Sequence, residues 1–163
     1  MLTQNDLKRV LRYDEQSGNL YWLTHGRGRK VHQPAGSVGS HGYRQIGIDG
    51  RQYLAHRLIW LFIHGAFPAF EIDHWDGDKT NNRIANLREA TRSQNKCNTR
   101  LRSDNSSGIK GVIFDSARGR WAAQIGGGKG HQFLGRYDTR EEAAAAYASA
   151  AVSRFGAFAR PLN

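Results

Sequence analysis

The sequence contains a single cysteine and no long hydrophobic run, and each shortage excludes a class of protein. Cys97 alone cannot form an intramolecular disulfide, and the lack of a Cys-x-x-Cys pair excludes a structural zinc site built on cysteines. No apolar stretch approaches the roughly 20 residues that a membrane-spanning helix needs, and the amphipathic N-terminus has no secretory signal. We therefore expect a soluble cytoplasmic protein that is not secreted and has no membrane partner.

Acidic residues are scarce relative to basic ones. The chain has 24 Lys and Arg against 14 Asp and Glu, which gives a formal net charge of +10 and a pI near 10.3. The excess is evenly spread, because residues 1–99 contain 14 basic and 9 acidic residues and residues 100–163 contain 10 and 5. A basic surface over both halves favours binding to a long polyanion such as nucleic acid over a pocket for one small anion.

Turn and capping signals in the first hundred residues predict mixed helix and strand, an α+β pattern. Thr3 can cap a short helix, and the Asp-Gly pair at 49–50 lies between two alternating segments, which predicts a β-hairpin. The apolar segment that begins at His56 and ends before Gly65 predicts a buried helix with a glycine cap.

A polar segment near residue 100 divides the chain into two modules. It is rich in Ser, Asn and Arg, so we place the modules at residues 1–99 and 108–163 and a linker at 100–107. Beyond it the pattern predicts three short strands, at residues 110–114, 120–125 and 131–137. A capping box then starts an alanine-rich helix, whose small side chains allow it to lie close against a sheet.

The segment from Ile72 to Asn98 is too polar for a core and contains four residues that suit one chemistry. A strand, a loop, a second strand and a capped helix are expected to present them around one hollow: Asp73, His74, Asn86 and Asn95. A carboxylate and an amide oxygen form an incomplete site that suits Mg²⁺ or Mn²⁺ together with water and phosphate. An adjacent imidazole is the usual general base near neutral pH, so the set predicts hydrolysis of a phosphodiester.

Other interpretations of this segment are weaker. An EF-hand fails because Ile72 would take the first ligand position when Gly77 is its glycine, and zinc lacks ligands because only His74 and Cys97 are suitable. Purely structural roles would have to account for all four residues within 23 positions. Neighbouring strand residues point to opposite faces, so the pattern leaves open how Asp73 and His74 could share one cleft.

The segment from about residue 56 to residue 98 resembles the HNH endonucleases of the phage and intron homing type. The match rests on the HRLIW segment and on Asp73-His74, Asn86 and Asn95. The resemblance implies a ββα-metal finger with its core at about residues 70–98, arranged around one scissile phosphate. Members with a structural zinc are excluded as models because their cysteines are missing. The third motif position is an asparagine instead of the histidine of many members, which keeps an oxygen ligand.

The same resemblance implies a role for each motif residue. Asp73 and Asn95 would bind the divalent metal, His74 would activate the water, and Asn86 would brace the loop that orients His74. For His56, at the head of its helix, local packing and a contact with DNA both remain open.

Residues 108–163 resemble the AP2 DNA-binding domain in the segments KGV, GRWAAQI, FLGRYDTREEAAAAYASAA, FG and PLN. The resemblance implies a three-stranded antiparallel sheet that packs on one helix and lies in the DNA major groove. The candidate DNA-binding residues are Lys110, Arg118, Arg120, Lys129, His131 and Arg136. Ile113 and Asp115 stand where the plant domains have arginines. The base preference of those domains therefore cannot be assigned to this chain, and a set of contacts made mainly to phosphate stays open. Trp121 and Phe133 are expected in the core.

Together the two modules predict an HNH homing-type endonuclease, acting in the bacterial host cytoplasm if it is phage-encoded. It would use Mg²⁺ or Mn²⁺ to nick or cut double-stranded DNA, and the AP2-like module would target it. We expect a monomer on DNA, which cuts one strand per visit. Two alternatives remain: a sequence-specific DNA-binding regulator with an inactive HNH scaffold, and a phage packaging or structure-specific nuclease.

Overall fold

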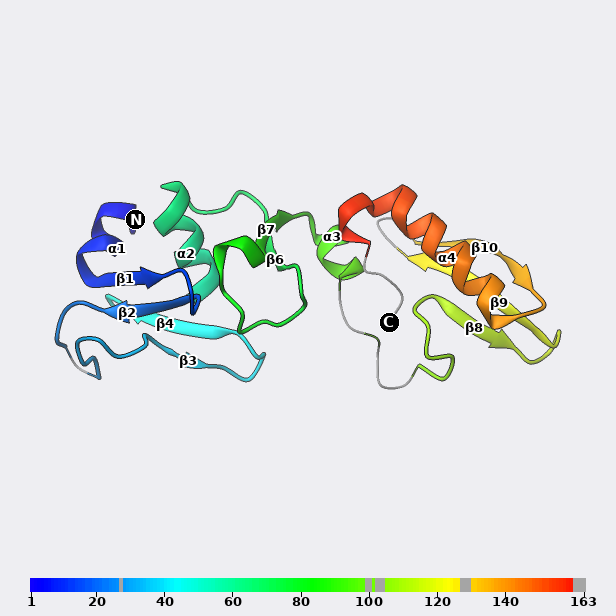
Figure 1. Ribbon diagram of the computed structural model, residues 1–163, viewed down its shortest axis with the longest axis horizontal. Helices are drawn as coiled ribbons and strands as arrows, with labels where there is room; N and C mark the ends of the chain where they lie inside the picture. The colour runs from blue at the N-terminus through cyan, green and yellow to red at the C-terminus, as the bar shows by residue number, and fades with distance from the viewer. Residues whose placement is uncertain (27, 99–100, 102–104, 127–129, 160–163) are drawn as a thin grey trace. The chain divides into compact units, whose positions relative to one another are not determined.

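The computed structural model describes residues 1–26, 28–98, 101, 105–126 and 130–159 of the chain (Figure 1). The chain forms two compact units, Met1–Ala90 and Thr91–Asn163, and both mix helices with antiparallel strands. The mixed α/β character expected from the sequence is therefore confirmed. Within the described residues, no helix is long and apolar enough to cross a membrane.

Within its described residues, the first unit contains three small antiparallel sheets and two α-helices. The sheets are β1 (Leu11–Asp14) with β2 (Asn19–Trp22), β3 (Ser37–Val38) with β4 (Arg44–Ile48) and β5 (Arg51–Leu54), and β6 (Glu71–His74) with β7 (Leu87–Ala90). The helices are α1 (Gln4–Val10) and α2 (Ala55–His64), and a 3-10 turn, η1 (Ile84–Asn86), leads into β7.

The local signals of this unit act as predicted. Thr3 and Asp6 form a reciprocal capping box at the start of α1. Asp49 and Gly50 both have positive φ, 48° and 76°, which is the turn geometry that joins β4 to β5 with the correct twist. Gly65 ends α2 in the left-handed conformation. The strand β1 is not predicted, because its four residues form too short an alternation to stand out.

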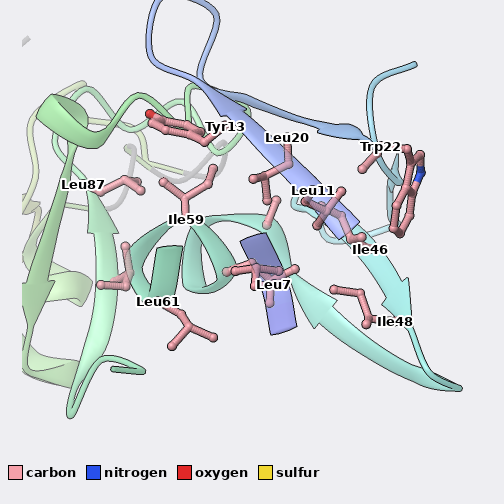
Figure 2. Close-up of a cluster of buried hydrophobic side chains, with 14 residues drawn as sticks. Leu7, Leu11, Tyr13, Leu20, Trp22, Ile46, Ile48, Ile59, Leu61 and Leu87 are labelled. Atoms are coloured by element: carbon pink, nitrogen blue, oxygen red, sulfur yellow. The ribbon is translucent and has the colours of Figure 1, made fainter. Parts of the chain in front are cut away.

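A single hydrophobic core supports this unit. Figure 2 shows side chains of α1, β1, β2, β4 and α2 pointing into one cluster, with Leu7, Leu11, Leu20, Ile46 and Ile59 at or below 1% exposure. Fully burying one such side chain contributes about 1.5–3 kcal/mol relative to leaving it in water. The core fixes the hairpin β1–β2 and the helix α2, which both border the polar segment after β6.

In the part of the second unit that the structure describes, there are one sheet, one long helix and one short α-helix. Its elements are α3 (Arg92–Cys97), β8 (Val112–Asp115), β9 (Arg120–Gly126), β10 (His131–Tyr137), α4 (Arg140–Phe155) and the 3-10 turn η2 (Gly156–Phe158). The strand order is β10-β9-β8, all antiparallel, and α4 packs on one face. The alanines of α4 allow this close packing, since Ala143 and Ala151 are buried against Val112, Ala123 and Ile125.

The short helix α3 belongs to the second unit. Its last residue, Cys97, is 7% exposed and lies in the same cluster as Val112 and Tyr147. The sequence placed this helix in the first module, before a linker at 100–107. Residues 99–100 and 102–104 lie outside the described residues, and the functional boundary between the modules stays a prediction.

Candidate functional site

A cluster of buried polar side chains in the first unit comes from α2, β6 and the segment that leads into β7. Its members are each 7% exposed or less: His56, Asp73, His74, Asn82 and Asn86. Burying a polar group is unfavourable unless it is hydrogen-bonded, so such a cluster has to be internally satisfied or functional. Three of the four motif residues predicted from the sequence lie in this cluster, and Asn95 lies on α3 in the second unit.

His74 is oriented by an asparagine of the following loop. Its Nε2 lies 2.9 Å from Asn82 Oδ1, and both side chains are buried. Because an amide oxygen only accepts, Nε2 donates and carries the proton of the neutral ring. The basic lone pair is then on Nδ1, the nitrogen that a general base would use. The Nδ2 of Asn82 is buried and makes no hydrogen bond within the described part of the chain.

The N-terminal hairpin holds the backbone around Asn82. The Tyr13 hydroxyl donates to the Asn82 carbonyl at 3.2 Å and accepts from Ile84 N at 2.9 Å. Burial raises the pKa of Tyr13, so the hydroxyl keeps its proton. Gly18, at φ 72°, packs so closely that an added Cβ would lie 2.6 Å from Arg83 N. The turn between β1 and β2 thus sets the position of the loop that orients His74.

Asn86 holds the C-terminal end of the loop between β6 and β7, the loop that carries Asn82. Its Oδ1 accepts from Asp76 N at 3.0 Å, and its Nδ2 donates to Asp76 Oδ1 at 3.0 Å and to Asn81 O at 2.8 Å. Burial acts to raise the pKa of Asp76, but hydrogen bonds from Asn81, the Asp78 amide and Asn86 outweigh it and lower that pKa. Asp76 is therefore ionised and accepts these bonds near neutral pH.

Asp73 is paired with a cation across the β6–β7 ladder. It lies directly opposite Arg88, whose Nε and Nη2 both approach Asp73 Oδ2 at 2.9 Å. Asp73 is 3% exposed, and a buried carboxylate needs such a counter-charge. Side chains of neighbouring residues in a flat strand point to opposite faces, yet both Asp73 and His74 are buried at the end of β6.

The donor types fit a hard divalent cation. Within the described residues, no group of three or more His, Cys, Asp or Glu side chains could hold a metal. A carboxylate and an amide oxygen instead fit Mg²⁺ or Mn²⁺, which complete their shells with water and phosphate oxygens. Asn95, the second predicted ligand, is half-buried on α3, and its backbone amide donates to Thr91 O at 2.9 Å.

Two aromatic rings pack behind His74. The rings of His56 and His74 are perpendicular with centroids 5.1 Å apart, and Tyr43 lies 5.2 Å from His56 and 5.9 Å from His74. Burial first, and then the neighbouring His74 and Arg57, lower the pKa of His56 to about 3. His56 is therefore neutral at physiological pH. Its 5% exposure favours the packing interpretation over a DNA contact.

Comparisons with known proteins match this site. A family model described as HNH endonuclease matches residues 53–97. Protein 3.8 of Escherichia phage T7 is 34% identical over 83 residues, which cover 50% of this chain and 69% of that protein. The chain belongs to the HNH endonucleases.

Two further proteins are similar to parts of this chain. An uncharacterized HNH endonuclease of Acanthamoeba polyphaga mimivirus is 36% identical over 126 residues, which cover 76% of this chain and 64% of that protein. A solved structure of DNA binding and cleavage by the HNH homing endonuclease I-HmuI is 26% identical, with a TM-score of 0.41. That match covers 53% of this chain and 49% of the other.

Three residues around the HNH motif are not predicted from the sequence: Tyr43, Asn82 and Arg88. Asn82 is the second residue of an Asn-Asn pair in a turn, where asparagine is common for conformational reasons alone. The partnership of Arg88 with Asp73 depends on the register of β6 and β7, which no local pattern fixes. Tyr43 lies before β4, far from the motif in sequence.

The six predicted DNA-binding residues lie on the second unit of this HNH protein, and three of them form surface ion pairs. Arg136 Nε and Arg118 Nη1 lie 2.9 Å and 3.3 Å from Asp115 Oδ2, and the Arg120 guanidinium lies 2.9 Å from Asp138 Oδ1. The other three are arranged differently: His131 is exposed at the start of β10, the Lys110 ammonium binds backbone carbonyls, and Lys129 lies outside the described residues.

One aromatic residue of this surface corrects an expectation. Trp121 is partly buried against the core, as predicted. Phe133 is not in the core, because it is 54% exposed and the Arg136 guanidinium lies 5.0 Å from its ring centroid. The register explains this result, since Phe133 pairs with the half-buried Gln124 and not with Ile125, which packs under α4.

Proposed function

We propose that the chain hydrolyses phosphodiester bonds of double-stranded DNA in a reaction that needs a divalent metal. The observation that carries the proposal is the hydrogen bond of His74 Nε2 to Asn82, which leaves the basic lone pair on Nδ1. A base held in one tautomer by a buried asparagine is arranged for proton transfer before substrate binds. HNH nucleases as a family depend on divalent metals, which agrees with the oxygen donors of this chain.

Asp73 and Asn95 would hold Mg²⁺ or Mn²⁺. The bound metal would supply charge to stabilise the phosphate oxygens in the transition state. His74 Nδ1 would take a proton from the attacking water, which forms a new P–O bond while the bond from phosphorus to the 3′ oxygen breaks. The products would carry 5′-phosphate and 3′-hydroxyl ends. Asn82 and Asn86 would act on His74 by holding its loop.

We propose that the second unit is an AP2-like DNA-binding module that targets the nuclease. Support comes from its three-stranded sheet with one covering helix, and from Arg120 and Arg136, whose positions in the register alternate with the residues that pack under α4. In its simplest form, the proposal describes a homing-type enzyme that acts as a monomer in the cytoplasm and nicks one DNA strand. Packaging or structure-specific cleavage would use the same site on another DNA.

The experiment that tests the proposal is cleavage of supercoiled plasmid and of genomic and phage DNA. The purified chain should convert DNA to nicked or cut forms with Mg²⁺ or Mn²⁺ and not with excess chelator. Mapping of the ends should find 5′-phosphates. Tight DNA binding without cleavage in either metal would instead favour a regulator whose HNH scaffold is inactive.

A further inference from the structure

The helix that carries Asn95 depends on the second unit for its position. α3 has only 6 residues, and so short a helix is not stable in water by its own hydrogen bonds. Thr91 and Gln94 cap its start, while at its end Cys97 is buried in the second core beside Tyr147. Burial raises the pKa of Tyr147 to about 12, and the neighbouring Cys97 contributes to the shift.

Lys110 holds the C-terminal end of α3. Its Nζ donates to Cys97 O at 2.7 Å and to Lys96 O at 3.2 Å. The last carbonyls of a helix have no partner within the helix and carry partial negative charge, so an ammonium there satisfies both. The contact lies within two residues of Asn95.

The backbone beside Lys110 is fixed in turn by the sheet. Gly111 has φ 72°, and an added Cβ would lie 2.3 Å from a ring carbon of Tyr147 and 2.4 Å from Gln124 O. Gln124 N also donates to Gly111 O at 2.8 Å. The backbone next to Lys110 is therefore held against the middle of β9, and this fixes the point from which the Lys110 side chain extends.

We propose that Lys110 is a positioning residue for Asn95, through which the AP2-like sheet sets the orientation of the metal-binding helix. The proposal rests on the proposed function, in which Asn95 is a metal ligand. It gives Lys110 a role different from the phosphate contact predicted from sequence. It also couples the two activities, because a sheet docked on DNA would hold α3 in the orientation that metal binding needs.

The test compares full-length Lys110→Gln and Lys110→Arg with the wild type. Lys110→Gln removes the cation and should raise the Mn²⁺ concentration for half-maximal single-turnover cleavage about 10–100-fold, as for other residues that orient metal ligands. Mn²⁺ binding, measured by electron paramagnetic resonance with and without duplex DNA, should weaken to a similar extent. Lys110→Arg keeps a cation and donors and should restore most of both. DNA affinity at fixed salt should change less than about twofold, since the ammonium is committed to carbonyls.

Each other outcome overturns the proposal. A loss of DNA affinity with a shallower salt dependence and an unchanged metal requirement would make Lys110 a phosphate contact. A lower rate with unchanged metal dependence, or no rescue by Lys110→Arg, would make its role merely structural. Asn95→Ala tests whether Asn95 is a metal ligand, independently of the role proposed for Lys110. If that variant binds Mn²⁺ and cuts as the wild type does, the proposed ligand is wrong, whatever Lys110 does.

Discussion

The two units arrange their functional side chains by opposite means. In the first, a buried hydrogen bond to Asn82 fixes His74. The loop that carries Asn82 is held in turn by Asn86 and by the hairpin β1–β2. In the second, Arg118, Arg120 and Arg136 form ion pairs in which the arginine side chains are 37–60% exposed.

The difference matters for function. Breaking a buried hydrogen bond leaves a desolvated group, which costs about 1–3 kcal/mol, whereas exposed ion pairs contribute about 0–1 kcal/mol and exchange readily. The first arrangement suits a catalytic base, which must be placed before substrate arrives. The second suits arginines that must leave a carboxylate to bind a phosphate or a base. Substitutions around His74 should therefore reduce cleavage, whereas substitutions of Arg118, Arg120 or Arg136 should change DNA binding.

Apart from His74 itself, the largest effect is expected at Asn82. Asn82→Leu removes the oxygen that fixes the His74 tautomer, so the single-turnover cleavage rate should fall about 10–100-fold while DNA affinity is retained. Asn82→Asp keeps an acceptor and is the matched control, with a smaller loss. Equal rates for Asn82→Leu and the wild type would show that the loop does not orient the base.

The next effect concerns His56 and the stability of the first unit. Its folded-state pKa, about 3, lies below the ordinary 6.5, so the unfolded chain binds the proton more tightly. Stability should therefore fall as pH drops from about 6.5 toward about 3, by up to a few kcal/mol at about 1.4 kcal/mol per pH unit. His56→Phe keeps an aromatic ring and does not titrate. Urea unfolding of both proteins across this range should give curves that diverge, and parallel curves would refute the assignment.

A smaller effect is expected at Arg120, which opens β9 next to Trp121. Arg120→Ala should relax sequence preference at one base pair by about 1–3 kcal/mol if the arginine contacts a base. Binding selection on randomised duplexes measures this change. An even loss of affinity across sequences, with a salt slope shallower by about one, would instead identify a phosphate contact.

The smallest effect is expected at Asp115. Its carboxylate accepts from Arg136 and pairs with Arg118, and these contacts lower its pKa. Asp115→Asn should release both arginines and remove a charge that repels phosphate, so DNA affinity should rise a few-fold with a steeper salt dependence. Cleavage at saturating DNA should not change. Weaker binding would mean that the ion pairs are needed to shape the surface.

Local chemistry explains which features the sequence predicts. The capping boxes at Thr3, Thr91 and Thr139 and the Asp-Gly turn act through neighbours within three residues, so all of them are recognisable and confirmed. The partnerships of His74 with Asn82 and of Asp73 with Arg88 depend on loop closure and strand register. The packing of Cys97 in the second core depends on long-range contacts, and so it cannot be predicted from local patterns.

The most direct test of the account is the single-turnover cleavage rate of His74→Ala, measured together with its DNA affinity. Loss of a general base predicts a rate about 10²–10⁴-fold lower with unchanged DNA binding. His25→Ala, which removes an exposed histidine of the same unit, should cut at the wild-type rate. A His74→Ala protein that cuts DNA as fast as the wild type would contradict the assignment of His74 as the base.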